Sequence, residues 1–244
     1  MANTEYDPDA DRHGYSRTAL ARLAYSDELA ELADQAAAHV PTIHDLFSNR
    51  GEAVGEALAL VALAEAVLTR AVVYERQRGA SWQQIGDQLD IARQSAHERY
   101  REVEEDWQLG LVEPLYPAQP VNIHGQVPVR GLRLPDAAYS PTPAAQRLDQ
   151  WVRDHLPRHR DTEHPVSGRL PKLTAAEEIS QVLAAITHLQ ETDAGPAERA
   201  AVMERKAALL ERIAAEEGKP DALQKAAEAR AYATQLRADA KARP

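Results

Sequence analysis

The distribution of proline sets the strongest limit on the fold of this 244-residue chain. Ten of its fifteen prolines lie between residues 114 and 171. Proline lacks an amide donor and clashes with the preceding helical turn, so this density prevents a long helix. On both sides of the segment, apolar residues recur at helical spacing. The sequence therefore predicts an all-α chain whose N-terminal helical domain and C-terminal helical segment are separated by a proline-rich connector.

Four segments follow from this pattern. The connector is expected to hold one short helix, from Pro143 to Leu156, and short strands around residues 121–123 and 127–134. The C-terminal segment is expected to form a helical hairpin or bundle, with a marginal third helix poor in large apolar side chains. The predicted segments are a disordered acidic tail (1–15), the N-terminal domain (16–109), the connector (110–171) and the C-terminal helices (172–244).

Within the N-terminal domain, helices are expected from about Ser16 to His39, Glu52 to Arg78 and Ser81 to Trp107. The apolar stripe of the second helix is too wide for an ordinary surface helix. This helix is therefore expected either at the centre of the domain or at a dimer interface. Gly79 should end it, because a left-handed residue is common at helix C-termini.

Composition excludes several classes of function. The chain has no cysteine, which rules out disulfides, thiolate metal sites and cysteine nucleophiles. Its net charge of −10 argues against a general coat for nucleic acid or anionic membranes, but permits one local DNA-reading surface. No uninterrupted run of about 18 apolar residues is present, so no membrane-spanning helix is expected. The acidic, polar N-terminus predicts no secretory signal, and the cytoplasm is the expected location.

No enzyme motif is apparent: we find no phosphate-binding glycine loop, nucleophile elbow, HExxH helix or dinucleotide fingerprint. We expect no catalytic residue and no cofactor. His155, His159 and His164 invite a metal-site interpretation, but Pro157 disrupts the helical spacing that would place the first two together. A solvated loop explains these histidines more simply, so no metal site is expected.

The most informative segment is residues 79–103, GASWQQIGDQLDIARQSAHERYREV. Ser81 is a suitable N-cap, and Gln84 occupies the position of its capping-box partner. A short helix, a tight turn at Asp90–Ile91 and a second helix from about Ala92 should follow. Gly86 is small where these helices must approach each other. The pattern predicts a helix-turn-helix, although plain helical packing would give a similar pattern.

The outer side of the second helix would carry Arg93, Gln94, Ser95, His97 and Arg101. Arginine pairs with guanine and glutamine with adenine in the major groove, while serine and histidine can contact phosphate. Residues 70–101 contain six arginines and four carboxylates, which gives a local excess of two positive charges in an acidic protein. The sign reverses at Glu102, Glu104, Glu105 and Asp106, which should point away from phosphate.

This segment resembles the helix-turn-helix of actinobacterial DNA-binding proteins and, more distantly, the sigma-factor region that reads the −35 element. Residues at matching positions are Trp82, Ile85, Gly86, Leu89, Arg93, Gln94, Ala96, His97, Glu98, Arg99 and Tyr100. The resemblance covers about a tenth of the chain and implies DNA binding. Two positions depart from it: Asp90 replaces the usual turn glycine, and Ala92 replaces a serine N-cap that contributes about 1 kcal/mol.

We therefore expect a sequence-specific double-stranded DNA-binding protein, a transcriptional regulator whose helix 92–103 enters the major groove as part of a homodimer. The expected DNA-binding residues are Ser81, Gln83, Arg93, Gln94, Ser95, His97, Arg99 and Arg101. The alternative is an acidic helical scaffold, for example in a plasmid-maintenance or other DNA-bound assembly. In that case the C-terminal helices bind a protein partner and the helix-turn-helix is auxiliary.

Overall fold

The computed structural model describes residues 8–43, 49–113, 133–171, 173–192 and 194–242. All regular structure in these ranges is helical, which confirms the predicted all-α class. The chain divides into two compact units, unit 1 (Met1–Lys172) and unit 2 (Leu173–Pro244), described separately below. The strands expected around 121–123 and 127–134 lie almost entirely outside the described residues.

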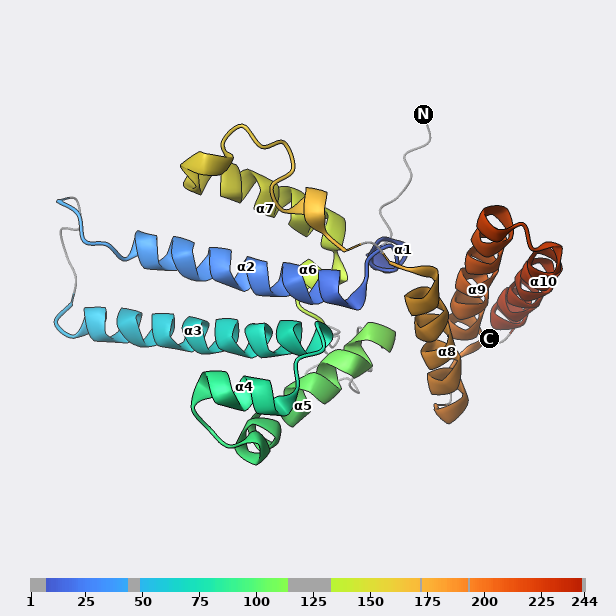
Figure 1. Ribbon diagram of the computed structural model, residues 1–244, viewed down its shortest axis with the longest axis horizontal. Helices are drawn as coiled ribbons and strands as arrows, with labels where there is room; N and C mark the ends of the chain where they lie inside the picture. The colour runs from blue at the N-terminus through green and yellow to red at the C-terminus, as the bar shows by residue number, and fades with distance from the viewer. Residues whose placement is uncertain (1–7, 44–48, 114–132, 172, 193, 243–244) are drawn as a thin grey trace. The chain divides into compact units, whose positions relative to one another are not determined.

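Unit 1 is built on an antiparallel pair of long helices, α2 (Arg17–Ala38) and α3 (Glu52–Gln77), which lie side by side (Figure 1). Ser16 caps α2 through a hydrogen bond from the Ala19 amide to its Oγ. The register of the pair is fixed by polar contacts: Thr18 Oγ1 to Gln77 O (2.9 Å), Arg70 to Glu28 (3.4 Å) and His39 to Glu56 (3.6 Å).

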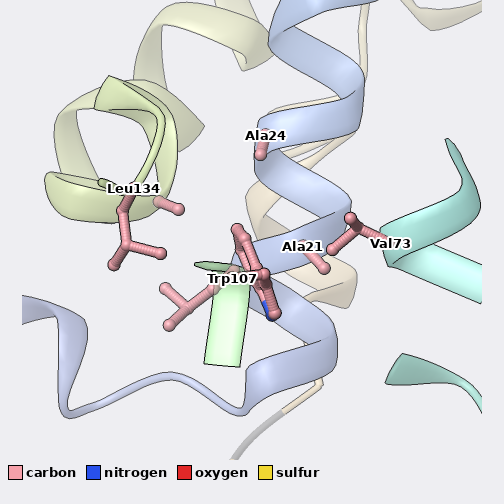
Figure 2. Close-up of a cluster of buried hydrophobic side chains, with 7 residues drawn as sticks. Ala21, Ala24, Val73, Trp107 and Leu134 are labelled. Atoms are coloured by element: carbon pink, nitrogen blue, oxygen red, sulfur yellow. The ribbon is translucent and has the colours of Figure 1, made fainter. Parts of the chain in front are cut away.

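The core of unit 1 lies around the N-terminal half of α2. Figure 2 shows the indole of Trp107 beside Ala21, with Val73 and Leu134 to either side. Trp107 belongs to α5 (Arg93–Val112) and Val73 to α3, so this cluster joins both helices to α2. Small alanines on α2 allow the close packing that a chain poor in aromatic residues requires.

Much of the segment expected to be an extended connector is folded into unit 1. Helices α6 (Asp136–Tyr139) and α7 (Pro141–His155) pack against α2. The bounds of α7 nearly match those of the helix predicted from Pro143 to Leu156. Pro141 starts α7 at a position where its missing amide costs no helical hydrogen bond. The prolines here therefore begin and separate short helices.

The structure also differs from the prediction that residues 1–15 form a disordered tail. Residues Pro8–Arg12 form a short helix, α1, within the segment expected to be disordered. Asp11 accepts hydrogen bonds from the amide of Thr142 (2.9 Å) and its Oγ1 (2.5 Å). These contacts hold the beginning of the described chain against α7.

The residues after α7 are held by one buried carboxylate. Asp149 Oδ1 accepts hydrogen bonds from the amides of Val166 (2.7 Å) and Ser167 (3.0 Å), and Oδ2 accepts one from Ser167 Oγ (2.5 Å). Asp149 is 3% exposed. Asp149 thereby ties the end of the predicted connector to α7.

Unit 2 contains α8 (Ala175–Glu191), α9 (Pro196–Glu217) and α10 (Pro220–Ala242). Thr174 and Glu177 form the predicted capping box of α8. Helix α10, expected to be marginal, packs along α9 around small side chains such as Ala200 and Ala233. Ion pairs also join α9 and α10: Arg230–Glu211 (2.6 Å), Arg230–Glu204 (3.5 Å) and Arg237–Glu204 (2.8 Å).

Helix α3 is not central to unit 1, because its buried residues are only Val72 and Val73. Among the described helices, α3 alone is long and apolar enough to cross a membrane by length and composition. The sequence predicted no such helix because it contains no uninterrupted apolar run of that length. Charged residues such as Glu65 and Arg70 interrupt the apolar sequence of α3. Length and composition alone assign no membrane role to α3.

Candidate nucleic-acid interface

The segment singled out by its sequence forms two helices, α4 (Trp82–Leu89) and α5, joined by a short turn (Figure 1). Ser81 and Gln84 form the predicted capping box at the start of α4. Asp90 adopts the left-handed conformation, with φ 53° and ψ 41°, which ends α4. Aspartate accepts this conformation more readily than most residues because its short polar side chain forms local hydrogen bonds.

Gly86 of α4 lies against the backbone of the turn and of the first residue of α5. A β-carbon there would lie 2.7 Å from the carbonyl oxygen of Ile91, closer than real contacts allow. The cluster that α4 and α5 share contains Ile85 of α4, Ala96 and Tyr100 of α5, and Val72 of α3. The cluster fixes α5 against both α4 and the end of α3. The close backbone approach at position 86 confirms the expectation that a small residue is needed there.

Arg76 anchors this pair of helices from α3. Its Nε lies 3.1 Å from Glu104 Oε1, its Nη1 donates to Ala80 O (2.5 Å), and its guanidinium lies 4.6 Å from the ring centroid of Trp82. From the sequence alone, Arg76 is only one of the six arginines that make residues 70–101 locally positive. Its contacts span α3, α4 and α5, which local spacing cannot reveal, so its role is structural.

The first two turns of α5 expose four expected DNA-binding residues, Arg93, Gln94, Ser95 and His97. Arg93 has no ion-pair partner among the described residues. Gln94 Nε2 donates to Glu98 Oε1 (2.8 Å), one turn further along α5. The rings of His97 and Trp82 make a T-shaped contact, with 5.4 Å between centroids. Gln94 and His97 therefore already contact neighbouring side chains, whereas Arg93 has no ion-pair partner among the described residues.

The other four expected residues already have local partners. Ser81 is part of the capping box, and Gln83 donates to Asp87 (2.7 Å). The guanidinium of Arg99 lies 5.3 Å from the ring centroid of Tyr100, and Arg101 pairs with Glu105 (3.0 Å). The structure thus places all eight expected residues on α4, α5 or the N-cap before α4, with most side chains held by neighbours within one helical turn.

These pairs lower the positive charge that the sequence suggested. Arg70, Arg76, Arg78 and Arg101 each face a carboxylate of unit 1. Arg93 and Arg99 are the two arginines of residues 70–101 for which the described residues provide no carboxylate partner. The local charge excess is therefore concentrated on the first two turns of α5.

The start of α5 is uncapped. Ala92 occupies the N-cap with extended geometry, φ −62° and ψ 149°, but offers no side-chain acceptor. We expect Ala92→Ser to raise the free energy of unfolding by about 1 kcal/mol, because a serine Oγ can accept a hydrogen bond from an amide of the first turn. Thermal or urea unfolding measures the gain.

Ser81→Ala is the matched control, because it removes a side-chain cap that is present and should lower stability by about 1 kcal/mol. A loss in this variant without a gain in Ala92→Ser would show that the start of α5 is already satisfied in another way.

Among the described residues, no cluster of three or more histidine, aspartate or glutamate side chains could hold a metal ion. His155 stacks on Trp151, and its Nε2 lies 3.5 Å from Asp34. His159 accepts from Arg158, and His164 lies 3.6 Å from Asp149. The three histidines thus have separate neighbours.

Comparison with protein-family models, with curated proteins and with solved structures finds no match to this chain. The functional argument therefore rests on the residues and their geometry.

Proposed function

We propose that this protein binds double-stranded DNA in a sequence-specific manner and regulates transcription, with α4 and α5 acting as a helix-turn-helix. The observation that carries the proposal is the rigid α4–α5 pair, which presents Arg93, Gln94, Ser95 and His97 on the first two turns of α5. Helix-turn-helix proteins insert this part of the second helix into the major groove, while the first helix crosses the backbone.

Each exposed side chain has a role that its chemistry supports. Arg93 and Gln94 would read guanine and adenine edges, and His97 would contact a base at the groove edge. Candidate phosphate contacts come from Ser81, Gln83, Ser95, Arg99 and Arg101. The exposed pairs Gln94–Glu98 and Arg101–Glu105 do not prevent this, because pairs one helical turn apart contribute only about 0.2–0.5 kcal/mol each.

The charge gradient along α5 favours one orientation. Its first turn carries Arg93 and the positive end of the helix dipole, whereas Glu102, Glu104, Glu105 and Asp106 follow further along. Phosphate attracts the positive first turn of α5 and repels the acidic residues further along the helix. The helix would therefore enter the groove with its N-terminal end. A single module binds weakly, so we propose a homodimer on a two-fold site.

The test is selection from a pool of random double-stranded DNA by the full chain at two salt concentrations, with sequencing of the retained fraction. An enriched motif whose affinity falls as salt rises is expected, because binding releases counterions from phosphate. A palindromic motif would indicate a dimer. No retention at low salt would overturn the proposal.

The double variant Arg93→Ala/Gln94→Ala should weaken binding to the selected motif at least about 30-fold, because it removes two proposed base contacts and each good one contributes about 1–3 kcal/mol. Arg199→Ala is the matched control: it removes the same charge from an exposed position on α9 in unit 2. Equal losses in both variants would show that net charge alone governs binding.

The acidic scaffold is the second candidate function. Glu98 and Glu105, which pair with Gln94 and Arg101 on α5, favour it, because they place negative charge beside the proposed DNA-binding residues. A scaffold would tolerate Arg93→Ala/Gln94→Ala and lose function when residues 172–244 are deleted.

A further inference from the structure

Glu98 lies at the centre of the exposed face of α5. It is two residues from both Ala96 and Tyr100, which are buried against α4, and two residues correspond to about 200° around a helix. Gln94 precedes Glu98 by one turn on the same face, and both side chains are exposed. Glu98 is the sixth residue of α5, so it lies within the two turns that the proposed function places in the major groove.

Gln94 and Glu98 form one polar unit. Gln94 Nε2 donates a hydrogen bond to Glu98 Oε1 at 2.8 Å. Within the described part of the chain, neither side chain has another hydrogen-bond or ion-pair partner. A carboxylate has a second acceptor oxygen, and an amide has a carbonyl oxygen and a second N–H. The pair therefore leaves Glu98 Oε2, Gln94 Oε1 and one Nε2 hydrogen available to a ligand.

These available groups correspond to base edges in the major groove. Adenine presents a donor at N6 and an acceptor at N7, and the carbonyl oxygen and second amide hydrogen of Gln94 can bind both. Gln94 can therefore read adenine without releasing Glu98. Cytosine presents the N4 amino donor and no acceptor at this edge. A carboxylate suits that donor well, because a hydrogen bond to an ionised acceptor is stronger than one to a neutral acceptor.

We infer that Glu98 is a specificity-determining residue, which accepts a hydrogen bond from the N4 amino group of a cytosine in the DNA site. The inference rests on the proposed function and adds Glu98 to the eight expected DNA-binding residues. Guanine and thymine present acceptor atoms but no donor at the major-groove edge, so a carboxylate repels both. Glu98 thus selects cytosine by attraction and rejects guanine and thymine by repulsion.

Helix geometry also predicts where this cytosine lies. Four residues separate Gln94 from Glu98, which corresponds to about 6 Å along α5. Successive bases of one DNA strand are about 3.4 Å apart. The cytosine is therefore expected one or two base pairs from the adenine that Gln94 reads. On a two-fold site, each half-site should carry the same combination of adenine and cytosine.

The charge of Glu98 should also lower the affinity for DNA of any sequence. Binding that does not depend on sequence comes from contacts with phosphate, which repels a carboxylate. Within the described part of the chain, no arginine or lysine forms an ion pair with Glu98. Removing this carboxylate should therefore strengthen binding to random DNA and weaken discrimination at one base pair. A residue that only stabilises the helix would not produce these two opposite changes.

The experiment measures binding of the full chain to the motif selected from random DNA and to versions in which each base pair is replaced in turn. Replacing the cytosine should weaken binding of the native protein about 5- to 10-fold per half-site, because a single hydrogen bond lies at the lower end of base-contact energies. Glu98→Ala should bind all four versions of that position alike. Glu98→Gln should prefer adenine there, because an amide offers both a donor and an acceptor.

Glu102→Ala is the matched control, because it removes the same charge from an exposed position one turn further along α5. It should keep the preference for cytosine, and circular dichroism checks that all three variants fold. A motif without this cytosine, or a cytosine preference that survives Glu98→Ala, would overturn the inference and leave the proposed function standing. No retention of DNA by the native protein would overturn both, so the two failures are distinguishable.

Discussion

Gly86→Ala is expected to lower the stability of unit 1 by about 2 kcal/mol, although alanine is the better helix former. The added β-carbon would lie 2.7 Å from the carbonyl oxygen of Ile91, and a backbone atom cannot rotate away. Helix α4 and the turn must therefore move apart, which loosens the cluster around Ile85 and Tyr100. Urea unfolding followed by tryptophan fluorescence measures this change, because Trp82, Trp107 and Trp151 all lie in unit 1.

Gly55→Ala is the matched control. Gly55 is also helical, in α3, but a β-carbon there would meet nothing within 4 Å. This variant should gain about 1 kcal/mol, because only the lower backbone entropy of unfolded alanine acts. The two substitutions are chemically identical and should change stability in opposite directions. A neutral or stabilising Gly86→Ala would show that α4 and α5 are not in close contact.

The sequence predicted α4 and α5 well because their determinants are local. The Ser81–Gln84 capping box, the turn at Asp90 and the small residue at position 86 each act within a few residues of themselves. Local hydrogen bonds and sterics of this kind can be identified without knowing the rest of the fold. The capping box of α8 at Thr174 was predictable for the same reason.

The packing of residues 133–171 was not predictable in this way. Proline density correctly indicates that no long helix can form there, but it does not distinguish an extended linker from short packed helices. The distinction depends on α2, whose Leu23 and Ala30 lie in one cluster with Ala144 and Leu148 of α7. These contacts join residues more than 100 positions apart, so no local pattern contains them.

The candidate site shows the same division. The sequence identified the side chains on the first turns of α5, because helical periodicity places them on the outer side. It did not reveal that Arg76 is held by Glu104, Ala80 and Trp82, because that contact depends on how α3 meets α4 and α5. Counting charges therefore overestimates the positive charge that is free for phosphate.

Asp149→Ala is expected to lower the stability of unit 1 by about 3 kcal/mol. It removes the acceptor for the Val166 and Ser167 amides, and a buried amide left without a partner costs about 1–3 kcal/mol. Asp154→Ala is the control on the same helix, because Asp154 is exposed and, among the described residues, accepts hydrogen bonds only from Gln150. It should change stability by less than about 0.5 kcal/mol.

The same carboxylate should make stability depend on pH. Burial raises the pKa of Asp149, but hydrogen bonds from Ser167, Val166 and His164 lower it by more, so its pKa lies below the ordinary value. A depressed folded-state pKa adds stability that is complete above the unfolded pKa of about 4 and is lost as the pH falls through the folded value.

Asp149→Asn keeps the side-chain shape without the titration. The stability difference between the native protein and this variant should be constant from pH 7 to 5 and shrink below about pH 4. A difference that stays constant down to pH 2 would show that the charge of Asp149 does not hold Val166 and Ser167 in place.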